Sequence, residues 1–138
     1  MVGYSGTPLA KKLGIGDGAR VALLDAPPNF IDMLQPVPLG VAFRKDLRAE
    51  AEVVVCFVTS RAALERRIDA IGRAVFPDGG AWVAWPKRAS KVPTDMTEDV
   101  VREVALPRGL VDNKVAAIDE TWSGLRVVWR RELRSGSK

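Results

Sequence analysis

The side chains best suited to binding a ligand lie in four short segments, each of which directly follows an apolar run. The segment after Trp85 carries Lys87 and Lys91, whose ammonium groups bind phosphates and carboxylates as point charges. Tryptophan adds a flat apolar surface. These residue types together indicate a site for an anionic or planar small molecule. The candidate residues are Asp25, Thr59, Ser60, Trp85, Lys87, Lys91, Thr94, Asp95, Asp119, Trp122 and Ser123.

The same residues also have structural explanations, and both readings stay open at this point. The lysines fit a solvated loop. Thr94 and Asp95 fit helix caps, because Glu98 follows Asp95 at the spacing of a capping box. Asp25 fits a cap or an ion pair with a basic neighbour, and the two tryptophans fit the core at the edge of the sheet.

The chain contains no histidine and only one cysteine, Cys56. This composition removes the commonest general base, nearly every zinc site and any internal disulfide. Cys56 lies in an apolar run without a histidine partner, so we expect a structural thiol. We predict no metal and no cofactor, with carboxylate-bound magnesium left open.

A chain of 138 residues that is 47% hydrophobic and 28% charged is the size of one domain with its own core. We therefore expect a single domain over residues 1–138, with flexible ends at 1–6 and 132–138. The net charge of +4 is spread along the chain, which does not favour nucleic acid as a partner. The sequence shows neither an apolar run of membrane-spanning length nor a leader pattern, so we expect a cytoplasmic protein.

Apolar periodicity predicts the elements that would position these residues. Continuous apolar runs predict buried strands at RVALLD, EVVVCFVTS and AWVAW, and GVAFR predicts a weak one. Apolar residues at helical spacing predict a long helix that begins after Ser60 and a shorter one at TEDVVREVAL. A short leading helix is predicted to be capped by Thr7 and ended by Gly14, and residues 29–35 fit one or two helical turns.

The chain should close with an antiparallel hairpin of LVDNKVAAID and LRVVWRR, connected through ETWSG. The predicted fold is α/β, a single Rossmann-like and mostly parallel sheet with this C-terminal hairpin. Ligands bind such sheets beyond the carboxyl ends of the strands. We therefore expect Lys87 and Lys91 to lie within reach of Asp25 and of the TWSG turn.

The stretch LGIGDGARVALLDAP resembles the opening of the class I S-adenosylmethionine-dependent methyltransferases, where a strand ends in an acidic residue and a glycine-rich loop. YSGTPLAKKLGI, WPK, PTDMTEDVVREVALPRGLVDNKV and DETWSGLR are more closely similar to an uncharacterised bacterial family of short proteins. That family has no assigned activity. The two resemblances imply a truncated methyltransferase-like fold.

The chain departs from the methyltransferase pattern at the loop that matters for the cofactor. Asp25 matches the acidic position, but Pro27 and Pro28 stand among the residues that replace the glycines. Two prolines remove two backbone N–H donors and fix φ, so no anion-binding nest can form. No acidic residue matches the position expected to hold the ribose. We therefore expect S-adenosylmethionine not to be bound.

These observations favour a non-catalytic protein that binds an anionic small molecule, or a regulatory protein, on a degenerate methyltransferase-like scaffold. One alternative is an enzyme, either a divergent methyltransferase or one that uses a lysine with Asp25 or Asp95 as acid and base. A second alternative is a homodimeric interaction module that pairs through an exposed edge at LRVVWRR.

Overall fold

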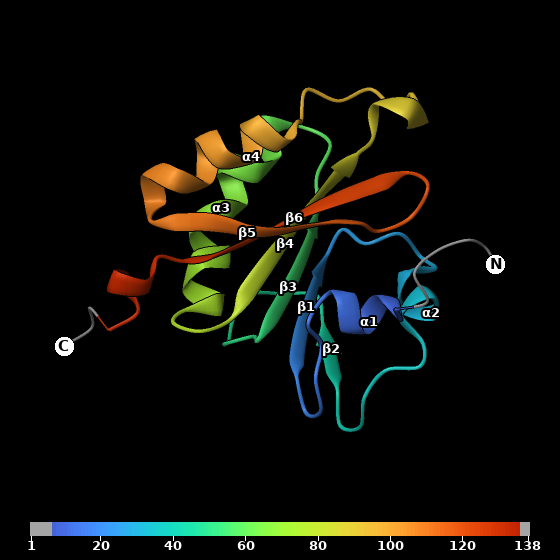
Figure 1. Ribbon diagram of the computed structural model, residues 1–138, viewed down its shortest axis with the longest axis vertical. Helices are drawn as coiled ribbons and strands as arrows, with labels where there is room; N and C mark the ends of the chain where they lie inside the picture. The colour runs from blue at the N-terminus through green and yellow to red at the C-terminus, as the bar shows by residue number, and fades with distance from the viewer. Residues whose placement is uncertain (1–6, 136–138) are drawn as a thin grey trace.

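The computed structural model describes residues 7–135 and contains a six-stranded sheet with helices on both faces (Figure 1). The strand order is β2-β1-β3-β4-β6-β5. Strands β2, β1, β3 and β4 are parallel, whereas β6 is antiparallel to both of its neighbours. The predicted α/β class with a C-terminal antiparallel hairpin is confirmed. The strands are β1 (Arg20–Leu24), β2 (Ala42–Arg44), β3 (Val53–Phe57), β4 (Gly80–Pro86), β5 (Leu110–Ala117) and β6 (Trp122–Trp129).

Two layers of helices cover the sheet and form a core on each side of it (Figure 1). Helices α3 and α4 pack on one face, and α1 and α2 pack on the other. The α-helices are α1 (Leu9–Lys12), α2 (Phe30–Leu34), α3 (Arg61–Val75) and α4 (Glu98–Ala105), and the short 3-10 helices are η1 (Arg88–Ser90), η2 (Leu106–Arg108) and η3 (Arg131–Leu133).

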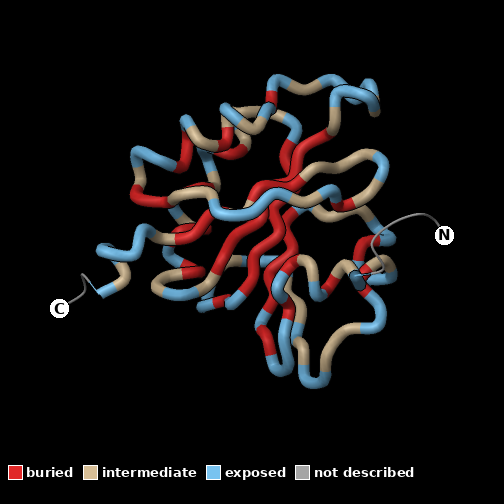
Figure 2. Tube along the Cα trace, viewed as in Figure 1, coloured by how far each residue is buried: buried red, intermediate tan, exposed pale blue. Residues whose placement is uncertain are grey.

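Buried strands form the centre of the sheet, where Figure 2 shows continuous burial. Every residue of β3 and of β4 is buried, as expected for strands covered on both faces. The predicted inward stripe of α3 is also confirmed, because Leu64, Ile68 and Ile71 are fully buried against this sheet. The valine-rich runs and the helical spacing therefore explain most of the architecture.

The closing hairpin differs from the prediction at its turn. The turn occupies residues 118–121, and Trp122 and Gly124 already belong to β6. Asp119 fixes the turn, because its carboxylate accepts hydrogen bonds from the N–H groups of Thr121 and Trp122, both at 2.8 Å. Gly124 lies inside the strand, where an added Cβ would lie 3.1 Å from the Trp82 side chain and would require that neighbour to shift.

The expectation of an exposed edge at LRVVWRR is wrong. That segment forms most of β6, which pairs with β4 on one side and β5 on the other. The outer edge on this side is β5, because the last strand returns between β4 and β5. An irregularity between Asp112 and Lys114 bends β5, a feature that discourages pairing with another strand.

The ends of the described region differ in detail from the sequence prediction. Pro8, rather than Thr7, is the N-cap residue of α1, and Gly14 follows the helix with a φ of +81°. The expected flexibility of 1–6 and 136–138 falls outside the described residues. Within the predicted flexible C-terminal segment, η3 places Leu133 over Gly109, where an added Cβ would lie 2.6 Å from the leucine side chain.

In residues 7–135 no helix combines the length and apolarity needed to span a membrane.

Candidate functional site

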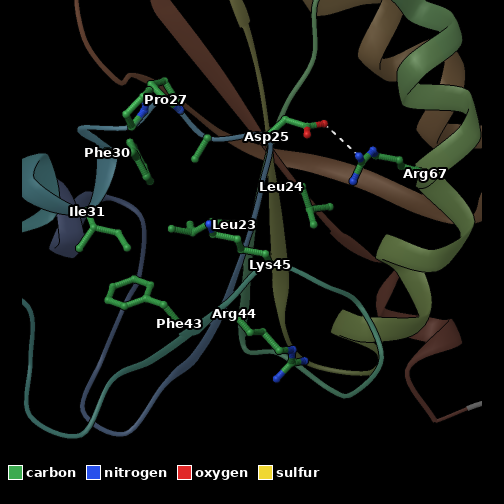
Figure 3. Close-up of a pocket in the computed structure, with 12 residues that line it drawn as sticks. Leu23, Leu24, Asp25, Pro27, Phe30, Ile31, Phe43, Arg44, Lys45 and Arg67 are labelled. Atoms are coloured by element: carbon green, nitrogen blue, oxygen red, sulfur yellow. Dashed lines mark hydrogen bonds and ion pairs between the residues drawn. The ribbon is translucent and has the colours of Figure 1, made fainter.

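The chain turns sharply at the carboxyl end of β1, at the candidate residue Asp25. Its φ is +58°, in the left-handed region that few residues other than glycine occupy and that aspartate tolerates better than most. The Asp25 carboxylate accepts a hydrogen bond from Arg67 of α3 at 2.9 Å (Figure 3). The turn then ends at α2, where the Phe30 N–H donates to the Pro27 carbonyl at 3.0 Å.

A cavity of about 430 Å³ lies between this turn, α2 and the end of β2 (Figure 3). Its volume falls within the range of small-molecule sites, about 300–1,000 Å³. Phe30 anchors the wall, because it is 1% exposed and packs edge-on against Phe57 with a centroid separation of 5.0 Å. The apolar lining consists of Leu23, Leu24, Ala26, Pro27, Pro28, Phe30, Ile31 and Phe43.

Three cations and one carboxylate complete the lining. Arg44 donates to the backbone carbonyls of Ala49 and Glu50, so it holds the segment after β2 in place. Arg67 is paired with Asp25. The Lys45 side chain has no hydrogen bond or ion pair with any residue in the described range 7–135. The Lys45 ammonium is therefore the cation of this cavity that is free to meet a ligand.

Ser60 and Asp95 lie together at the start of α3, where both satisfy backbone donors. Ser60 Oγ accepts a hydrogen bond from the Ala63 N–H at 3.1 Å, and the Asp95 carboxylate accepts one from the Arg61 N–H at 2.8 Å. The capping interpretation of Asp95 is therefore correct in kind, but the helix that it caps is α3. The cap of α4 is Thr97, which accepts a hydrogen bond from Val100.

Thr94 and Thr59 connect the same two segments. The Thr94 hydroxyl donates to the Thr59 carbonyl at 2.6 Å and accepts a hydrogen bond from the Met96 N–H at 2.9 Å. The first of these hydrogen bonds ties the segment before α4 to the residues just before α3, and the second lies within the segment before α4. The threonines thus lie close to Ser60 and Asp95, and the Thr94 hydroxyl bonds to backbone groups.

The remaining candidates lie at the β4–β6 side of the sheet. Trp85 is 8% exposed and belongs to the core. Trp122 packs edge-on against Phe57 with a centroid separation of 5.0 Å, and Ser123 lies opposite Trp85 in the strand pairing. The structural interpretation of the tryptophans is the one that these contacts support.

Lys87 is next to the hairpin turn, because its N–H donates to the Thr121 carbonyl at 2.7 Å. Lys91 ends η1 with a φ of +64°. Of the candidate residues, the cavity lining includes Asp25 and none of the others. In residues 7–135 no group of three or more histidine, cysteine or carboxylate side chains is arranged to hold a metal ion.

Lys45 and Arg67 are the two functional candidates that sequence reasoning missed. Lys45 directly follows the weak strand GVAFR. Because ligands bind beyond the carboxyl ends of strands, Lys45 also met the criterion for a candidate residue. Arg67 comes three residues after Leu64 and borders the inward stripe of α3. Neither position could be paired with Asp25 without knowing which strands are neighbours.

Cys56 takes no part in this cavity. It is fully buried in β3, and burial raises the pKa of its thiol to about 12. A thiol that stays protonated is a poor nucleophile. These features agree with the structural interpretation.

Solved structures of methyltransferases share this fold. An S-adenosylmethionine-dependent methyltransferase from Aquifex aeolicus matches with a TM-score of 0.58 and 12% identity, over 86% of this chain and 86% of its own. Magnesium protoporphyrin IX methyltransferase from Synechocystis PCC 6803, solved with bound S-adenosylmethionine, matches with a TM-score of 0.54 and 8% identity, over 88% of this chain and 74% of its own. No family model and no curated protein sequence matches the chain. The methyltransferase-like fold is confirmed, and membership of the uncharacterised bacterial family stays a prediction.

Proposed function

We propose that this chain binds an anionic small molecule in the cavity beside Asp25 and does not transform it. The observation that carries this proposal is the free Lys45 ammonium next to apolar walls. Three cations face one carboxylate in the lining, which leaves an excess of positive charge. Low-dielectric walls strengthen the attraction of such a site for an anion.

The composition of the lining supports a binding function over catalysis. The cavity lining contains no hydroxyl or thiol group among the described residues. Its one carboxylate, Asp25, is paired with Arg67. Nucleophilic and general-base mechanisms both need a reactive group that is aimed at the substrate, and lysine provides one only in its unprotonated form. A ligand in this cavity would instead meet cations and apolar surface.

The same lining does not suit S-adenosylmethionine. Pro27 and Pro28 form part of the wall and offer no N–H donors. The cofactor carries a net positive charge, and the excess of positive charge in the lining would repel it. We expect a dissociation constant above about 1 mM, which corresponds to less than about 4 kcal/mol of binding free energy.

Calorimetry on the purified chain tests the proposal. Phosphate, sulfate, nucleotides, aliphatic and aromatic carboxylates and S-adenosylmethionine are titrated into the wild type and into Lys45→Ala and Lys87→Ala. We expect at least one anion to bind the wild type, with about tenfold or greater loss in Lys45→Ala, because a charge-assisted contact contributes about 1.5–3 kcal/mol. Lys87→Ala should bind as the wild type does.

Three outcomes would contradict this assignment. Binding of no anion would remove the proposed function. Loss in Lys87→Ala with no loss in Lys45→Ala would move the site to the loop of Lys87 and Lys91. Micromolar binding of S-adenosylmethionine would favour the alternative, a divergent methyltransferase, which the fold shared with cofactor-bound enzymes supports.

A further inference from the structure

Asp25 and Arg67 form an ion pair between a carboxylate and a guanidinium in the lining of the proposed binding cavity. Arg67 Nη2 lies 2.9 Å from Asp25 Oδ2, and both residues belong to the lining. The side chains are 36% and 63% exposed, so a solute can reach the pair. Exposed ion pairs are weak and exchange readily with other partners. Arg67 is therefore already engaged by the type of group that an anionic ligand would present.

The residues around the pair indicate what the rest of such a ligand would consist of. Lys45 supplies a second, unengaged cation in the same lining. Phe43 offers aromatic surface, and Pro27 adds a rigid apolar wall. Planar guanidinium groups bind planar carboxylates with matched geometry. The cavity thus combines a carboxylate-binding end with walls suited to a flat apolar body.

Resting on the proposed function, we infer that Asp25 is an internal competitor for Arg67 and that the ligand is a carboxylic acid with an aromatic body. The ligand carboxylate takes the place of the Asp25 carboxylate on Arg67 and also meets Lys45, while its ring lies among the apolar residues. Asp25 then sets the affinity, because only molecules with Arg67 released are fully competent to bind.

Competition by Asp25 and contact of Asp25 with a cationic ligand have opposite effects on ligand affinity when the charge of Asp25 is removed. If Asp25 contacted a cationic ligand favourably, removing its charge would weaken binding. If Asp25 competes with the ligand, removing its charge strengthens binding. An exposed ion pair of ordinary strength is closed in at most about 85% of molecules, so it lowers the apparent affinity about sixfold at most.

The test uses calorimetry with biphenyl-4-carboxylate as the probe and biphenyl-4-carboxamide as its uncharged counterpart. Asp25→Asn and Asp25→Gly both remove the carboxylate, and both residue types tolerate the positive φ. Asp17→Asn makes the same charge change in the turn before β1 and serves as the control. We expect about two- to sixfold tighter binding of the carboxylate in both Asp25 variants, no change in Asp17→Asn, and no gain for the carboxamide.

A double-mutant cycle locates the effect. Arg67→Gln should weaken binding of the carboxylate, and adding Asp25→Asn to Arg67→Gln should bring no further gain, because the competition needs Arg67. Equal or weaker binding in the Asp25 variants would overturn the inference while leaving the proposed function intact. Binding of phosphate without binding of the biphenyl carboxylate would overturn the ligand class. Binding of no anion by any variant would overturn the proposed function itself.

Discussion

Two halves of the carboxyl edge of the sheet contain similar polar residues and use them differently. In the cavity half, formed by residues 23–31 and 43–45, Lys45 has no partner within the described chain and faces apolar walls. In the capping half, formed by residues 59–61 and 94–97, Ser60, Thr94 and Asp95 bind backbone groups. Position at this edge therefore does not make a binding site. A site also needs a polar group whose bonding capacity the fold has left unused.

The largest expected effect tests whether the cavity wall is also part of the core. Phe30→Ala should destabilise the protein by about 3–5 kcal/mol, because it removes a buried ring and leaves a void. Urea denaturation measures the change. Ile31→Ala in the same helix is the control, because Ile31 is 40% exposed and should cost much less. Equal losses in the two variants would mean that Phe30 does not anchor the wall.

A smaller effect distinguishes the capping half from the cavity half. Asp95→Ala should cost about 1 kcal/mol of stability, because the Arg61 N–H at the start of α3 loses its acceptor. Anion binding, measured by calorimetry, should stay as in the wild type. Thr97→Ala removes the corresponding cap of α4 and should behave in the same way. A change in ligand affinity in Asp95→Ala would show that the two halves act as one site.

The smallest effect lies at the opposite edge of the sheet, where Glu52 precedes β3. Hydrogen bonds from the Arg20 side chain hold the pKa of Glu52 at about 2, below its ordinary 4.5, although burial works in the other direction. A lowered pKa in the folded state stabilises the protein above the unfolded-state pKa, and this contribution disappears as the pH falls from about 4.5 through about 2. Because both side chains are nearly half exposed, solvent screening limits the contribution to about 1 kcal/mol or less.

Glu52→Gln should therefore flatten the dependence of unfolding free energy on pH within that window. Chemical denaturation at several pH values measures this dependence. Glu120→Gln serves as the control, because Glu120 forms no ion pair within residues 7–135. An unchanged pH profile in Glu52→Gln would show that the Arg20 pair contributes nothing to stability.

The architecture was largely predictable because its determinants are local. The run VVVCF could only be a buried strand, and the spacing of Leu64, Ile68 and Ile71 defined the inward face of α3. The position of β6 was not predictable in the same way. Antiparallel pairing of the hairpin followed from its sequence, whereas the side on which β6 would join β4 depends on tertiary packing.

Of the candidate residues, only Asp25 lines the cavity, and whether it belongs to a binding site stays a prediction. Arg67 is 42 positions away from Asp25, and Asp95 is 34 positions away from Arg61, whose N–H donates a hydrogen bond to the Asp95 carboxylate. Such partners are chosen by the arrangement of strands, which residue spacing does not encode. Sequence reasoning therefore identified polar residues at the correct edge and could not tell which of them the fold would satisfy.

The insertion of β6 between β4 and β5 also determines the order in which the sheet can be completed during synthesis. Strand β5 precedes β6 in the chain, yet within residues 7–135 its only partner in the sheet is β6. Until β6 has emerged, β5 has no place to pair and β4 keeps an open edge of unpaired backbone groups. A folding intermediate in which β6 has not yet paired would therefore expose two unpaired strands at once, which makes it the species most prone to aggregate.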